Sequence, residues 1–238
     1  MSRNEKAEAY LYRGEAFAFG GYLTNPFYEN LETQAPSVLS PTGGYSSARA
    51  EDFRYREFFS FTRATTQVIG TYNEREGEFN TLMSATIENL NILNMVTADL
   101  VSCRLAVTYK GDPTQPEKPS VNPAGSFFVN LRVGGKPFDP DVPSALGTIS
   151  PKSEMSDLIA KLRTDANGKR RRATLARNEL LHNGPLVIPQ FGSIFIADWL
   201  DDEYAPQLTM VRIELGCTPS GRISGAGVGN GSGGWPST

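Results

Sequence analysis

The feature that most constrains the fold of this chain is an apolar residue at every second position along several stretches. In residues 100–109, every second side chain is apolar: Val101, Cys103, Leu105, Val107 and Tyr109. Successive side chains of a strand point to opposite faces, so this period predicts a strand with one buried face. An amphipathic helix would need apolar spacings of three and four, which the stretch does not supply.

The alternation recurs in further stretches, whose predicted inward residues are Phe53, Tyr55, Phe59 and Phe61; Phe127, Val129, Leu131 and Val133; and Thr209, Val211, Ile213, Leu215 and Cys217. Residues 79–93 and 192–199 are also predicted strands, although their patterns are less regular. The chain is therefore predicted to be mainly β, a single-domain sandwich or barrel-like pair of sheets.

A helical insertion is expected at about residues 150–183, where the apolar period changes. Ser150 before Pro151 is a helix start signal, and Leu158, Ile159 and Leu162 form an apolar stripe. Asn167-Gly168 ends this helix, and a shorter one is predicted from about Arg172 to Leu181.

The composition along the chain suggests an organisation around one β domain. Residues 1–50, rich in aromatic residues and glycine, are predicted to form an N-terminal arm, and residues 51–217 the β domain. Residues 110–125 carry four prolines and are expected to form a long surface loop. Residues 218–238 are rich in glycine and are predicted to form a flexible C-terminal tail.

Aromatic side chains in the two predicted arms suggest contacts with neighbouring subunits, because aromatic residues are enriched in interface cores. The predicted interface residues are Tyr10, Tyr12, Phe17, Phe19, Tyr22, Phe27 and Trp235. A chain that ends after Gly221 is therefore expected to fold but to associate more weakly.

Net charge and hydropathy limit the partners. The net charge is −3, which gives no indication of a nucleic-acid partner, and no apolar run is long enough to span a membrane. The N-terminal sequence lacks the apolar core of a signal peptide. We expect a cytoplasmic protein, or one that is exported without a cleaved signal. Residues 152–177 carry eight basic against three acidic side chains, and residues 198–203 carry four acids and no base, which would suit head-to-tail contacts between copies.

Few residues suggest catalysis. His182 is the single histidine, lies at a predicted helix end, and is interpreted as a helix cap rather than a catalytic base. Cys103 and Cys217 lie on apolar strand faces and are interpreted as slowly reacting core thiols; sequence leaves open whether they pair.

Two charged clusters are interpreted as solvated surface. Asp198, Asp201, Asp202 and Glu203 lack the spacing of a calcium loop, and a hairpin tip is the preferred interpretation. The basic run from Lys169 to Arg172 lacks interleaved aromatic residues. No cofactor or metal ligand set is predicted.

Four blocks of sequence resemble a group of functionally uncharacterised microbial β-rich proteins. These are "ENLNILNMVTADLVSCRL", "GSFFVNLRVGGKP", "IPQFGSIFIADW" and "LTMVRIELGC", together about a third of the chain. The resemblance implies a shared β fold and transfers no activity and no site residue.

The sequence thus favours a non-enzymatic structural or self-assembling protein whose terminal arms contact neighbouring subunits. Two alternatives remain open at this stage. One is a β module that binds a carbohydrate or another ligand through exposed aromatic residues, and the other is a hydrolase with a carboxylate-based site.

Overall fold

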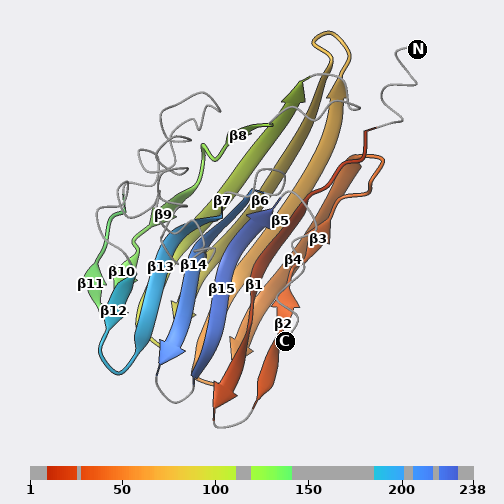
Figure 1. Cartoon of the computed structure of the whole chain (residues 1–238). Helices are drawn as coiled ribbons and strands as arrows, with labels where there is room; N and C mark the ends of the chain where they lie inside the picture. Colours follow the sequence, from red (N-terminus) through yellow and green to blue (C-terminus); the bar gives the residue numbers. More distant parts are fainter. Residues whose placement is uncertain are drawn as a thin grey trace, which may run out of the picture.

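The chain forms two antiparallel sheets, so the prediction of a mainly β protein is confirmed (Figure 1). The computed structural model describes residues 10–25, 28–110, 119–140, 185–200, 206–216 and 220–229. The predicted helical insertion at 150–183 lies outside these residues, as does 111–118 of the predicted proline-rich loop. Within the described part, 119–125 includes a short strand paired with a longer one.

The seven-stranded sheet combines strands from both ends of the chain, in the order β12-β13-β14-β15-β1-β2, with β3 paired to β1. Its strands are β1 (Glu15–Asn25), β2 (Glu29–Gln34), β3 (Ser37–Val38), β12 (Leu186–Ile188), β13 (Gly192–Leu200), β14 (Gln207–Gly216) and β15 (Ser220–Gly229).

The eight-stranded sheet is built from the middle of the chain, in the order β11-β10-β7-β6-β5-β4, with β8 and β9 paired to β7. Its strands are β4 (Gly44–Tyr55), β5 (Phe59–Asn73), β6 (Glu78–Ile92), β7 (Val96–Lys110), β8 (Ser120–Asn122), β9 (Phe127–Val129), β10 (Arg132–Val133) and β11 (Lys136–Pro137).

One hydrophobic core joins the two sheets, which lie face to face (Figure 1). The largest fully buried side chains come from both: Phe19, Phe59, Phe79, Met83, Ile87, Leu90, Ile92, Leu105, Ile194, Leu208, Met210 and Ile213. The predicted inward face of β7 is confirmed for Val101, Cys103, Leu105 and Val107. Burial of these alternating faces supplies the main drive for folding.

The prediction of an N-terminal arm is wrong for the described residues. Residues 15–25 form β1, which lies inside the seven-stranded sheet between β15 and β2. β2, β3 and the first half of β4 also fall within the predicted arm. Glycine-punctuated chain was interpreted as irregular, but Gly21 lies opposite Ile223 in a regular register and the strand continues through it.

The prediction of a flexible tail is wrong for residues 220–229. This segment is β15, which pairs with β14 on one side and with β1 on the other. Its glycines allow close approach rather than flexibility. A Cβ at Gly227 would lie 2.2 Å from ring atoms of Phe17, and a Cβ at Gly221 would lie 2.1 Å from the carbonyl oxygen of Tyr22. Glycine here is thus a packing requirement.

One predicted strand has different boundaries in the structure, and another has its two faces reversed. Residues 51–72 form parts of two strands, β4 and β5, joined by a turn in which Arg56 has a positive φ of 51°. All the predicted inward aromatic residues of this hairpin do pack against the core. In β9 the faces are reversed: Phe127 and Val129 are exposed, and Phe128 packs against the core.

In the eight-stranded sheet, the alternation of faces inverts along one row that crosses four neighbouring strands. Two consecutive residues are unburied in each strand, namely Glu51 and Asp52, Thr62 and Arg63, Glu88 and Asn89, and Asp99 and Leu100. The register is unchanged on either side of the row, because every strand inverts at the same place. Asp52 and Asn89 have φ of 51° and 54°, which Asp and Asn tolerate better than most residues.

The seven-stranded sheet has a matching row in which the consecutive residues are buried instead. They are Ile196 and Ala197, Met210 and Val211, Gly225 and Ala226, and Ala18 and Phe19. This inversion explains why Leu208 and Met210 are buried in β14 while the predicted inward residue Thr209 is not.

Candidate interaction surface

The most distinctive surface feature is the edge strand β4. It has 12 residues, whereas the edge strands β2, β12 and β11 have 6, 3 and 2. Among the described residues β4 pairs only with β5, and no hydrogen bond there uses the backbone groups of 44–54 that face away from β5. Folded proteins commonly shorten such edges because unpaired backbone groups attract other strands.

The first half of β4 alternates regularly. Tyr45, Ser47, Arg49 and Glu51 are exposed, and the residues between them are half-buried. Ala48 and Ala50 pack against the core. The alternation continues as far as Glu51 and then inverts at Asp52, so residues 45–51 form one regular pleated segment with a free edge.

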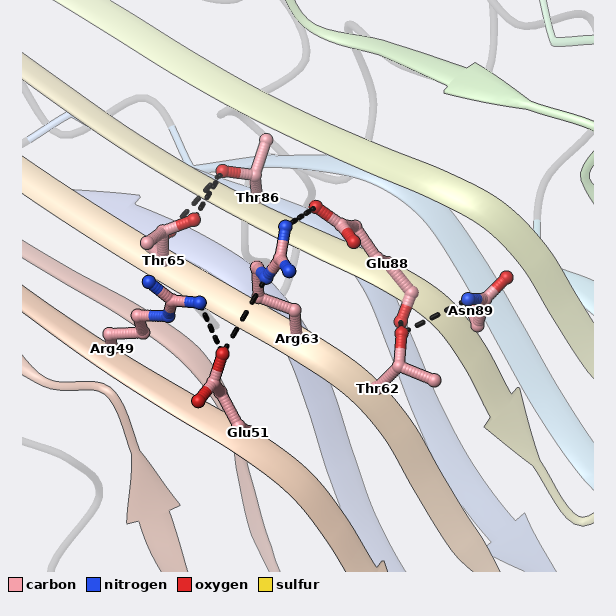
Figure 2. A network of polar contacts seen from close by, with 8 residues as sticks. All are labelled: Arg49, Glu51, Thr62, Arg63, Thr65, Thr86, Glu88 and Asn89. Atoms are coloured by element: carbon pink, nitrogen blue, oxygen red, sulfur yellow. Dashed lines mark hydrogen bonds and ion pairs between the residues drawn. The ribbon is translucent and has the colours of Figure 1, made fainter.

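The outer face beside this edge carries a network of charged side chains (Figure 2). Arg49 pairs with Glu51 on the same strand, and Arg63 Nε of β5 lies 3.8 Å from the Glu51 carboxylate. Arg63 also reaches Glu88 of β6 at 3.3 Å. Each of these side chains is about half exposed, and exposed pairs of this kind contribute roughly 0–1 kcal/mol each. The network orients the side chains more than it stabilises the fold.

Hydroxyl and amide groups extend the network along the inverted row (Figure 2). Asn89 Nδ2 donates to Thr62 Oγ1 at 3.0 Å, and the Thr62 hydroxyl donates to the backbone carbonyl of Glu88 at 3.3 Å. Thr65 and Thr86 are hydrogen-bonded across β5 and β6 at 3.3 Å. Each acid in Figure 2 has an arginine partner, so this face suits recognition of a polar surface better than proton transfer.

Protection of the β4 edge is uneven. The charged residues Arg49, Glu51, Asp52 and Arg54, together with the inversion, all lie after Ala48. Charges and irregular backbone discourage edge-to-edge pairing. Residues 44–48, with sequence GYSSA, contain no charge, no proline and no inversion.

An apolar row begins at Tyr45, whose side chain is 61% exposed. Tyr45 lies opposite Ile69 of β5, and Ile69 lies opposite Leu82 of β6. Ile69 and Leu82 are half-buried, and their neighbours Val68 and Met83 are buried, so the row faces outward. The uncharged half of the edge thus continues into an apolar strip on the sheet.

A second polar centre lies in the seven-stranded sheet around Arg212, which is only 6% exposed. Its guanidinium pairs with Asp198 and Glu214 and lies 3.5 Å from the ring centroid of Phe195. Burial lowers the pKa of Arg212 from its ordinary value, and the Glu214 carboxylate opposes that shift. Asp198 therefore belongs to β13 and to a part-buried ion pair, and the prediction that it lies at a solvated hairpin tip is wrong.

The predicted interface aromatics are divided by the structure. Tyr12 and Phe19 are buried in the chain's own core, so the prediction is wrong for both. Tyr10 stacks on the core residue Phe79, with ring centroids 4.0 Å apart.

Phe17 and Tyr22 are half-buried on β1, an interior strand of the seven-stranded sheet, so neither belongs to a terminal arm. Phe27 and Trp235 lie outside the described residues.

The prediction that Cys103 is a core thiol is confirmed. It is fully buried and forms no disulfide among the described residues, and burial raises the pKa of its thiol well above the ordinary value. Cys217, His182, the basic run 169–172 and the acidic residues 201–203 all lie outside the described part of the chain.

The β4 edge is what the sequence-based reasoning missed. Its first half fell within the predicted arm, although Ser46, Ala48 and Ala50 alternate with Tyr45, Ser47 and Arg49. Small inward residues give a weak hydrophobic signal, and that alternation was the signal available.

Across residues 10–25, 28–110, 119–140, 185–200, 206–216 and 220–229, no group of three or more His, Cys, Asp or Glu side chains could hold a metal ion. In that same part of the chain, no helix has the length and the hydropathy that a membrane span requires.

The model of a family described as "Domain of unknown function (DUF8256)" matches residues 10–179, which is most of the 238-residue chain. The chain belongs to this family. The expected resemblance to functionally uncharacterised proteins is thereby confirmed, and the match spans the strands from β1 to β11 but ends before β12. No curated protein and no solved structure matches the chain.

Proposed function

We propose that this protein is a non-enzymatic structural module that assembles with copies of itself. The observation that carries the proposal is the free edge of β4, a strand of 12 residues that pairs on one side only among the described residues. A strand of that length with unpaired backbone groups is a template for another strand.

In this proposal the contacts between copies are made by other strands than those expected from the sequence. The terminal segments that were expected to reach neighbouring subunits contribute β1 and β15 to the interior of the seven-stranded sheet. The association surface is therefore assigned to β4 and to the outer face beside it. Arginine and glutamate alternate across that face, which favours contact with a similarly mixed surface.

Sedimentation velocity of the full chain over a wide range of protein concentrations tests the proposal. Self-assembly predicts species heavier than the 26.0 kDa chain whose fraction rises with concentration. A single species of 26.0 kDa at every concentration would refute it.

A second candidate is a β module that binds a glycan, favoured by the end of the sheets near Tyr28. The ring of Tyr28 is 70% exposed and stacks with Tyr22, with centroids 6.3 Å apart. Nearby, Tyr55 donates a hydrogen bond to Glu29, and Arg56 lies over the Tyr55 ring. Exposed rings beside polar groups bind sugars. Retention of the wild type on a glycan array, lost in Tyr28→Ala, would favour this candidate over assembly.

A further inference from the structure

We propose that the first half of β4 pairs with the first half of β4 from a second copy of the chain, antiparallel about a twofold axis centred on Ser47. This inference rests on the proposed self-assembly and names its contact. Tyr45 of each copy then lies opposite Arg49 of the other copy, and the two eight-stranded sheets form one continuous sheet.

The edge is free to accept a strand over this segment. Residues 45–51 are extended and regular, and their outward backbone groups have no partner among the described residues. Two identical strands related by a twofold axis normal to the sheet run antiparallel, and each contact then occurs twice. Such a closed pairing uses up both edges and stops at two copies.

The alternation of faces limits the register. Exposed residues must lie opposite exposed residues, because a shift by one would set Ser47 of one copy against Ala48 of the other, which packs on the core. The twofold axis must therefore pass through a residue of β4. Beyond Glu51 the faces are inverted, so regular pairing ends there.

Charge and length exclude most of the remaining axis positions. An axis at Arg49 would place like charges opposite each other, which is destabilising. An axis at Ala50 pairs Arg49 with Glu51 but then sets the core-facing Ala48 against the exposed Asp52. An axis before Ser47 would leave few residues to pair, because the strand begins at Gly44.

Axes at Ala48 and at Ser47 both place exposed residues opposite exposed residues. The two axes differ in which side chains lie opposite each other. An axis at Ala48 places Tyr45 opposite Glu51 and leaves Arg49 opposite Ser47. An axis at Ser47 places an aromatic ring opposite a guanidinium twice, a favourable contact, and sets the two Ser47 hydroxyls together. On the core-facing side it brings Ser46 next to Ala48, and both side chains are small.

The first test compares Tyr45→Lys with Val187→Lys by sedimentation velocity. Both residues are exposed on edge strands, at 61% and 69%, but Val187 lies on β12 of the other sheet. Tyr45→Lys removes both ring contacts and sets a lysine opposite each Arg49, so we expect association at least about tenfold weaker. Val187→Lys should associate like the wild type. Equal association of the two variants would overturn the inference.

The second test maps the axis with thiol crosslinking in a Cys217→Ser background. With the axis at Ser47, Ser47→Cys places two thiols on directly opposite residues, whose Cβ atoms lie about 5 Å apart. Gln67→Cys is the matched control, because Gln67 lies opposite Ser47 on β5, one strand further from the axis. Its two copies would be about 14 Å apart, three strand spacings.

A short bismaleimide should therefore join copies of Ser47→Cys much faster than copies of Gln67→Cys. Crosslinking that is equal at Ser47→Cys and Gln67→Cys would overturn the assigned axis. A wild type that associates while these variants show no preference refutes the edge pairing alone. A wild type that stays at 26.0 kDa refutes the proposed self-assembly as well.

Discussion

Replacing Gly221 by alanine tests whether the glycine-rich segment is an interior strand or a tail. Gly221 has a φ of +153°, and a Cβ there would lie 2.1 Å from the carbonyl oxygen of Tyr22 and 2.7 Å from the Cα of Leu23. Both are backbone atoms of β1, so no side chain can move aside to make room.

The expected loss of stability has two parts. A side chain at a φ that L-residues rarely adopt costs about 1–3 kcal/mol. Displacing packed neighbours to relieve an overlap costs roughly another 1–3 kcal/mol. Gly221→Ala should therefore lower the free energy of unfolding by about 2–6 kcal/mol, a large share of the roughly 5–15 kcal/mol that is typical of domains.

Urea denaturation of Gly221→Ala alongside Gly216→Ala measures the effect. Gly216 is an exposed glycine on the adjacent strand β14, and its Cβ would meet only ordinary contacts at 3.6 and 4.0 Å. Gly216→Ala should be within about 1 kcal/mol of the wild type. If both variants unfold at the same urea concentration as the wild type, β15 is not held between β14 and β1, and the reasoning fails.

Three further predictions follow from the packing. Phe19→Ala should lower the free energy of unfolding in urea by about 3–5 kcal/mol, because Phe19 is fully buried near Phe53 and Phe59. The control variant Tyr28→Ala, at an exposed position, should stay within about 0.5 kcal/mol of the wild type. A loss of association without a loss of stability would instead favour an interface role for Phe19. Cys103 should resist a thiol reagent in the native Cys217→Ser protein and react once urea is added, since burial raises the pKa of its thiol; labelling at the rate of a free thiol before unfolding contradicts its placement. Burial, with contributions from Tyr12 and Tyr109, raises the pKa of Tyr10 from 10.0 to about 12. Its neutral form stabilises the fold below pH 10, and that contribution should be lost as the pH rises from about 10 to about 12; tyrosinate absorbance of the wild type minus Tyr10→Phe should show the late titration, and a midpoint near 10 would contradict it.

Much of the eight-stranded sheet was predictable from local patterns. The period of two in β7 placed Val101, Cys103, Leu105 and Val107 on one face, and all are buried. Phe53 and Tyr55 of β4 and Phe59 and Phe61 of β5 were likewise predicted to face inward and do so. These predictions succeed because the residues are large and apolar, so each strand carries its own burial signal whatever its neighbours are.

The candidate surface was less accessible to sequence reasoning. Ser46, Ala48 and Ala50 bury little apolar area, so the first half of β4 carries a weak signal. An edge is moreover a property of strand order, and strand order depends on contacts between distant segments. The reversed faces of Phe127 and Phe128 have the same origin, because pairing of β9 with β7 decides which side faces the core.

The sequence by itself determined that this chain is mainly β and which faces of its apolar strands are buried, because alternation acts residue by residue along one strand. Only the tertiary structure decided that residues 15–25 and 220–229 become interior strands, and where along the strands the alternation of faces inverts. Residues 220–229 have little apolar surface and become a strand through hydrogen bonds to β14 and β1 on both sides. The glycines that suggest a flexible tail in isolation are the residues that let Tyr22 and Phe17 approach the strand. An isolated segment has neither neighbour, so its sequence alone favours disorder.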